Sequence, residues 1–264
     1  MTGLNGFINK IFLLLSGFLL TLNLVGQTFF GPGGAIPDDG NPVSFTINVA
    51  QLSHSSIDTA FGLESVCFNI MHTWDSDLEI ALIAPDGSFV ELLSGLGGGD
   101  DNFLNTCLTN NIDSSVLFAV APFTGIFHPA GDPGIVNNGQ PGTGAWKLYI
   151  HDTWAYADQG HLIDWSITFG ENPSKPFPFE SSNLPIIVIN TYKKFIPDDP
   201  KIMAHMGIID NGPGMRNYRT DPFNGYDGFI GIERRGSSSQ SFPKKSFGFE
   251  TWDQLGSEIK RPVW

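Results

Sequence analysis

Short segments in which apolar and polar residues alternate recur along this chain, and they restrict its fold more than any other feature. In Glu64–Trp74, for example, Val66, Phe68 and Ile70 fall on one face and the residues between them on the other. This period of two is typical of a β-strand with one buried face. The segments with this pattern are Val43–Ala50, Glu64–Trp74, Asp77–Ala84, Ser88–Leu93, Ser115–Val120, Ala145–Asp152 and His161–Phe169. Since turn-forming residues separate them without a helical period, we predict an all-β protein built as a sandwich or barrel.

The composition agrees with many strands and loops and restricts the partners. The 264 residues include 31 glycines and 18 prolines, and only 16% of them are charged. Lys and Arg number 14 against 27 Asp and Glu, which gives a net charge of −13. This acidity argues against binding to nucleic acid or to an anionic membrane, because affinity for phosphate comes from Lys and Arg.

The N-terminal residues 1–27 are typical of a secretory signal peptide. Lys10 precedes a mostly apolar run from Ile11 to Val25, which is shorter than the about 20 residues of a membrane-spanning helix. The alternative is an uncleaved N-terminal anchor. Either interpretation takes the rest of the chain out of the cytoplasm, and we expect a secreted protein with no membrane contact beyond this segment. We interpret the Gly/Pro-rich residues 28–42 as a leader ahead of the first strand.

Cys67 and Cys107 are the two cysteines of the chain. In an oxidising compartment an isolated pair is most simply one disulfide, and two buried free thiols are the alternative.

Composition also divides the chain. Residues 43–170 hold the alternating strands, and residues 171–183 contain three prolines among small polar residues and are predicted to be a linker. Residues 184–264 form a second, β-rich unit that we interpret as incomplete, because its last residues show no closing pattern.

Residues 43–169 resemble the P domain, also called P/Homo B, that accompanies subtilisin-like proprotein convertases. Three ordered pieces carry the resemblance: HTWDSDLEIALIAPDGSFVELL from His72, TGIFHP from Thr124 followed by GTGAWKLYIHD from Gly142, and GHLIDWSITF from Gly160. The resemblance implies a jelly-roll-like β-sandwich. It also implies that the loop Gly97–Cys107 pairs its cysteine with the strand that carries Cys67.

The second unit resembles the start of the spore-coat protein H (CotH) kinase-like family. The match includes SNLPIIVINT from Ser182, IPDDPKIMAHMGIID from Ile196 and IGIERRGSSSQSFPKKSFGFET from Ile230. The resemblance implies that Lys244 or Lys245 approaches nucleotide phosphates in a complete domain. The alternative is that this basic cluster lies at a sheet edge and pairs with surface carboxylates.

Calcium is the one cofactor that the sequence suggests. Asp75 and Asp77 would share one face of a strand, and Asp100, Asp101 and Asn102 lie in a Gly-rich loop. Hard cations bind several oxygen ligands on adaptable loops, and some P domains carry calcium. Solvated turn carboxylates are the alternative.

Five aromatic residues suggest a further binding surface: Trp74, Trp146, Trp154, Trp165 and Tyr156. Trp146 and Trp165 lie on alternating strands and are predicted to be in the core. Trp154 and Tyr156 follow a strand in a loop and could form an exposed platform for carbohydrate or peptide.

The sequence shows no serine-protease motif, and we assign no catalytic residue. None of the six histidines lies in a subtilase-like motif, and the Ser-rich piece at Gly236–Gln240 is not a nucleophile motif. We expect a secreted, non-catalytic accessory module that binds an adjacent domain or an extracellular protein. The alternatives are the N-terminal fragment of a secreted CotH-like kinase and a part of a proprotein-convertase-type protease system.

Overall fold

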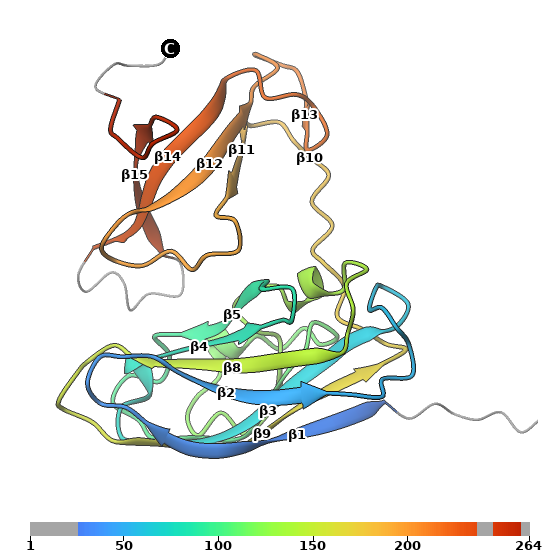
Figure 1. Ribbon diagram of the computed structural model, residues 1–264, viewed down its shortest axis with the longest axis vertical. Helices are drawn as coiled ribbons and strands as arrows, with labels where there is room; N and C mark the ends of the chain where they lie inside the picture. The colour runs from blue at the N-terminus through green and yellow to red at the C-terminus, as the bar shows by residue number, and fades with distance from the viewer. Residues whose placement is uncertain (1–25, 237–244, 260–264) are drawn as a thin grey trace, which may run out of the picture.

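A computed structural model gives the structure of the chain, and it describes residues 26–236 and 245–259. Residues 62–170 and the strands before them form two sheets that face each other, with the second unit as a separate sheet (Figure 1). The predicted signal peptide lies outside the described residues except for its last two. Within the described ranges, no helix has the length and apolar character needed to cross a membrane.

One sheet of the sandwich has five strands in the order β1-β9-β3-β6-β7. Their bounds are Gln27–Ile36 for β1, Gly160–Gly170 for β9, Gly62–His72 for β3, Phe103–Leu108 for β6 and Gly125–Phe127 for β7. All pairs are antiparallel except β6 with β7, which is parallel.

The other sheet has four antiparallel strands in the order β2-β8-β4-β5. These are β2 (Val43–Val49), β8 (Gly144–Asp152), β4 (Leu78–Ile83) and β5 (Phe89–Ser94). The inward residues of both sheets form one core that includes Phe68, Ile80, Leu148 and the fully buried Trp146 and Trp165. This arrangement confirms the predicted all-β sandwich, and it arises because each strand buries the alternate residues that its sequence makes apolar.

The predicted leader is wrong in part, because residues 27–36 form strand β1. This strand pairs with β9 from Gln27 opposite Phe169 to Ile36 opposite Gly160. Its glycines permit a close approach: a Cβ at Gly33 would lie 2.0 Å from the carbonyl oxygen of Leu162. A glycine-rich segment therefore serves here as an edge strand rather than as a loop.

Three further segments differ from the sequence prediction. Ser115–Val120 was expected to be a strand, but it contains the short 3₁₀ helix η2 (Val116–Phe118), which Ser115 caps through its side chain. Residues 125–144, where the sequence shows no alternating segment, contain β7 and the 3₁₀ helix η3 (Pro133–Val136). The start of the predicted linker packs on the sandwich, since Ser174 is fully buried and its amide donates to the carbonyl oxygen of Leu63.

The second unit is a four-stranded antiparallel sheet in the order β11-β12-β14-β15. The strands are β11 (Ile186–Asn190), β12 (Ile202–Ile209), β14 (Tyr226–Arg235) and β15 (Ser246–Trp252), and the short β10 (Ser181–Ser182) pairs with β13 (Asn217–Tyr218). Its buried core consists of Ala204, Met206, Ile230 and Ile232, which is small beside the core of the sandwich. The β-rich character predicted for this unit agrees with the structure.

Candidate functional site

Cys67 on β3 and Cys107 on β6 lie directly opposite each other and form a disulfide. The predicted bond is therefore present, and the alternative of two free thiols is wrong. The bond fixes β6 beside β3 and thereby holds the Gly-rich loop that precedes β6.

Asp75, the first residue of the 3₁₀ helix η1 (Asp75–Asp77), forms hydrogen bonds with that loop. Its side chain is fully buried, and Oδ1 accepts a hydrogen bond of 2.8 Å from the amide of Asn102. Its own amide donates to the carbonyl oxygen of Asp100 over 3.1 Å. Burial raises the pKa of Asp75 to about 7, and the charges of Asp101 and Asp100 raise it as well, against the hydrogen bond from Asn102. Oδ2 has no hydrogen-bond partner, which agrees with a carboxyl group that is readily protonated.

Among the residues predicted to bind calcium, Asp75 contacts the loop of Asp100 and Asp101 through its backbone, but the described carboxylates form no ligand cluster. Asp75 and Asp77 lie on a 3₁₀ turn and not on a strand, so that their spacing of two does not place them on one face. Asp100 and Asp101 are exposed on the Gly-rich loop. In the described ranges, no group of three or more His, Cys, Asp or Glu side chains is arranged to hold a metal ion. The predicted calcium site remains a prediction.

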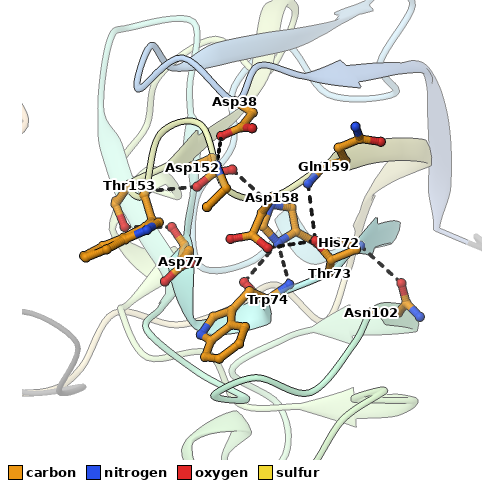
Figure 2. Close-up of polar contacts among 12 residues, drawn as sticks. Asp38, His72, Thr73, Trp74, Asp77, Asn102, Asp152, Thr153, Asp158 and Gln159 are labelled. Atoms are coloured by element: carbon orange, nitrogen blue, oxygen red, sulfur yellow. Dashed lines mark hydrogen bonds and ion pairs between the residues drawn. The ribbon is translucent and has the colours of Figure 1, made fainter.

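A buried histidine–aspartate pair lies at the end of the sandwich beside η1 (Figure 2). Nε2 of His72, the last residue of β3, is 3.2 Å from Oδ2 of Asp152, the last residue of β8. Nδ1 of His72 is 2.9 Å from the carbonyl oxygen of Trp74, and Oδ1 of Asp152 accepts from the amide of Trp154 over 3.1 Å. The pair thus fixes the backbones that carry two tryptophans from opposite sheets.

These two tryptophans line a surface hollow of about 520 Å³, together with Asp77, Ala157 and Asp158. Trp74 is 48% exposed and Trp154 is 66% exposed, although both are large aromatic side chains. Burial raises the pKa of Asp77 to about 6, and the neighbouring Asp158 and Asp152 raise it further, whereas His72 lowers it. We call this hollow the tryptophan–aspartate pocket.

The walls of the tryptophan–aspartate pocket are held by hydrogen bonds between distant segments. The amide and the hydroxyl of Thr153 both donate to the carbonyl oxygen of Asp77, each over 2.9 Å. Oδ1 of Asp158 accepts from the hydroxyl of Thr73 over 2.9 Å (Figure 2). The amide of Ala157 donates to Oδ1 of Asp38. The pocket is therefore a pre-formed feature and does not depend on a single loop.

The predicted burial or exposure of the aromatic residues is correct, but the predicted pairing of Trp154 with Tyr156 in one surface is not. Trp146 and Trp165 are buried, and Trp154 and Tyr156 are exposed, as predicted. Tyr156 does not line the pocket, however, and Trp74 takes its place beside Trp154. Trp74 was among the aromatic candidates of the sequence, but its pairing with Trp154 could not be predicted, because about 80 residues separate the two tryptophans.

A second polar cluster joins the sandwich to the second sheet. Arg234 on β14 is 6% exposed, and its guanidinium donates to Glu79 on β4 and, over 3.0 Å, to Glu91 on β5. The guanidinium also lies over the ring of Phe195, 4.3 Å from its centroid. We call the outward surface of β4 and β5 that carries Glu79 and Glu91 the acidic face.

Electrostatics at the acidic face follow from burial and from these pairs. Burial disfavours ionisation of Glu79, but the neighbouring His151 and the charge of Arg234 outweigh it and hold the pKa of Glu79 below its usual value. Burial raises the pKa of Glu91, against the opposing charges of Arg234 and Lys245. A charged pair network of this kind costs desolvation, so it specifies the geometry of the contact more than it adds stability.

The residues predicted to approach a nucleotide lie at the same contact. Lys244 lies outside the described residues. Nζ of Lys245 donates to the hydroxyl of Ser94 on β5 over 2.8 Å, and burial lowers the pKa of Lys245. This partner of Lys245 is a hydroxyl and not a carboxylate, and both the nucleotide role of Lys244 or Lys245 and the alternative of pairing with surface carboxylates remain predictions. The sequence analysis did not identify Glu79 or Glu91 as functional candidates. Both occupy polar positions of alternating strands, where a solvent-facing residue is the ordinary expectation.

Residues 64–169 match the family described as "Proprotein convertase P-domain". The matched segment runs from β3 to β9 and covers seven of the nine strands of the sandwich. The P-domain resemblance is confirmed for this segment, and the resemblance of residues 184–264 to the CotH family remains a prediction.

Among curated proteins, leupeptin-inactivating enzyme 1 of Streptomyces exfoliatus is 30% identical over 146 residues. The alignment covers 54% of this chain and 26% of that enzyme, so the chain spans about a quarter of its length. Among solved structures, the serine protease of Aeromonas sobria in complex with its chaperone is 20% identical, with a TM-score of 0.31 over 55% of this chain and 27% of that one. The same protease alone is 19% identical, with a TM-score of 0.29 over 55% and 28%.

Proposed function

We propose that this chain is a secreted, non-catalytic contact module of a protease system, in which the P-type sandwich holds a neighbouring unit. The observation that carries the proposal is the family match, which falls on residues 64–169 and thus on the sandwich itself. The similarity of 146 residues to leupeptin-inactivating enzyme 1, of which they cover 26%, agrees with a unit that accompanies a larger enzyme. The disulfide supports export, because such bonds persist in oxidising compartments.

The acidic face supports a role in contact with an adjacent unit. Glu91 on this face accepts a hydrogen bond from the buried guanidinium of Arg234. The hydroxyl of Ser94 accepts a hydrogen bond from Lys245. The ring of Phe89 packs against the ring of Phe195, with 5.1 Å between the centroids. Lys193 adds an ion pair with Asp86 over 2.7 Å. Aromatic and arginine side chains surrounded by polar contacts are typical of protein interfaces.

The chemistry of the buried pair also favours a structural role. The His72 ring contacts Trp74 and Asp152, and a nucleophilic mechanism would require a serine or cysteine in place of one of these. Ser53 lies 3.1 Å from the adjacent His54, but both are exposed and the imidazole stacks on Phe61.

Two experiments test the proposal. The purified chain is incubated with casein and with a fluorophosphonate probe for active serines, and we expect neither cleavage nor labelling. The immobilised chain is then exposed to the culture fluid of its source organism after labelling with the same probe. Retention of a labelled serine hydrolase is expected, and labelling of the chain itself or retention of no labelled protein would overturn the proposal.

The kinase-like alternative and the calcium site are tested separately. If residues 184–264 begin a nucleotide-binding domain, the full gene product binds an ATP analogue with Mg²⁺, and Lys244→Ala with Lys245→Ala weakens that binding. If Asp75, Asp77, Asp100 and Asp101 bind calcium, then CaCl₂ raises the melting temperature of the chain, whereas MgCl₂ does not.

A further inference from the structure

The tryptophan–aspartate pocket has two aromatic walls whose backbones are held by hydrogen bonds. The Trp74 ring lies against Gly99, where an added Cβ would be 3.1 Å from the ring. Its backbone is held by the buried His72, and the backbone of Trp154 is held by Asp152. Exposed tryptophans with a fixed backbone lose little conformational freedom on binding, which favours recognition of a ligand.

The polar part of the pocket is negative. Asp77 and Asp158 both line the pocket, and the charge of Asp158 disfavours ionisation of Asp77 and so raises its pKa. The other charged groups that act on Asp77 are Asp152 and His72, and Asp152 adds further negative charge. Two neighbouring carboxylates are stabilised when a cation enters between them.

We propose that the tryptophan–aspartate pocket binds the guanidinium of an arginine side chain on a protein partner. The indole faces of Trp74 and Trp154 would stack on the planar cation, and Asp77 and Asp158 would accept its N–H groups. A guanidinium satisfies aromatic and carboxylate walls together, whereas an ammonium group lacks the planar fork. The chain is strongly acidic overall, which would steer a basic partner segment toward it.

A metal ion fits this pocket less well than a guanidinium does. Calcium requires six to eight oxygen ligands, and indole rings supply none. Across the described residues, no group of three or more metal-ligating side chains is arranged to hold an ion. The inference deepens the proposed contact function, because it names the chemistry of one partner side chain, and it is tested without a protease.

The test is a titration of the intact chain with the blocked tripeptide acetyl-Gly-Arg-Gly-amide, followed by NMR of the indole N–H groups. The signals of Trp74 and Trp154 are expected to shift in a saturable manner. Those of the buried Trp146 and Trp165 stay in place and report that the fold is intact. Acetyl-Gly-Gln-Gly-amide has a similar size without the charge and is expected to cause no saturable shift.

Variants assign the binding to the pocket. Asp77→Asn and Asp158→Asn are each expected to weaken binding of the arginine peptide about tenfold, as for a lost charge-assisted hydrogen bond. Two variants serve as matched controls. Asp113→Asn removes an equal charge from an exposed site, and Tyr156→Asn removes an exposed aromatic ring while tolerating the positive φ of 67° there. Both are expected to leave the affinity unchanged within about twofold.

Three results would overturn the inference: no saturable shift with the arginine peptide, an equal shift with the glutamine peptide, or unchanged affinity in both aspartate variants. A shift caused by CaCl₂ without one caused by the peptide would replace it with a metal site. None of these results depends on whether a serine hydrolase is retained in the capture experiment, so the two proposals fail independently.

Discussion

The buried pair of His72 and Asp152 connects the two sheets at the edge of the tryptophan–aspartate pocket, with 3.2 Å between Nε2 and Oδ2. Each partner also binds the backbone of a pocket tryptophan, Trp74 in one case and Trp154 in the other. The contact between the two sheets and the positions of the pocket tryptophans therefore depend on the same two side chains.

Replacement of His72 by phenylalanine keeps a ring in the core but removes both hydrogen bonds. Asp152 then loses a buried partner, and we expect the free energy of unfolding to fall by about 2–4 kcal/mol. The exposed tryptophans should move as well, which intrinsic fluorescence detects. The exposed His161→Phe is the control, and an equal loss of stability in both variants would contradict the role of the pair.

Asp75 gives a prediction for pH. Its pKa in the folded protein is about 7 against 3.8 as the ordinary value, so the folded state binds a proton that the unfolded state has released between these pH values. Stability contributed by this group is present at low pH and is lost as the pH rises from about 4 to 7. Asp75→Asn preserves the acceptor for the Asn102 amide and cannot ionise.

We therefore expect the difference in unfolding free energy between Asp75→Asn and the unmodified chain to grow in favour of the variant by about 2–3 kcal/mol as the pH rises from 5 to 8. Urea denaturation at the two pH values measures this difference. Parallel pH dependence in the two proteins would show that Asp75 is ionised in the fold.

The disulfide closes a loop of 40 residues between Cys67 and Cys107. Loss of the bond enlarges the entropy of the unfolded chain, and Cys67→Ala with Cys107→Ala is expected to cost about 4 kcal/mol. Urea denaturation measures the loss, and a change below about 1 kcal/mol would indicate that the bond constrains the unfolded chain little.

Gly33 tests whether β1 belongs to the sandwich. A Cβ there would meet the carbonyl oxygens of Leu162 at 2.0 Å and Ile163 at 2.2 Å, and both belong to the backbone of β9. Gly33→Ala is expected to destabilise the fold by about 1–3 kcal/mol through overpacking. Gly248→Ala, where the closest contact would be an ordinary 3.4 Å, is the matched control. Equal melting temperatures for the two variants would mean that β1 detaches at no cost.

Much of the sandwich could be predicted from sequence, because a half-buried strand must alternate and Val66, Phe68 and Ile70 do so. The missed strands lack that signal for physical reasons. β1 has glycine where β9 comes close, β6 is interrupted at Asn105 with a φ of 51°, and β7 has only three residues. Short or irregular strands are stabilised by their neighbours and not by their own pattern.

The candidate site was less predictable. The motif around Trp74 and Asp77 was visible, but its partners Trp154 and Asp158 come from a loop about 80 residues later. The contacts of Arg234 with Glu79 and Glu91 span 155 and 143 residues. Such pairs form where two sheets pack against each other, and the spacing of residues within one segment of the sequence does not predict that contact.

The contact between the sandwich and the second sheet is tested most directly by a double-mutant cycle on Arg234 and Glu91, measured by scanning calorimetry of the intact chain. Because the guanidinium is buried between two carboxylates, Arg234→Gln and Glu91→Gln should each lower the transition of the second sheet. The effects should also be non-additive by about 1–3 kcal/mol. Strictly additive effects, or a second sheet whose transition neither variant moves, would contradict a sandwich that holds its neighbour through the acidic face.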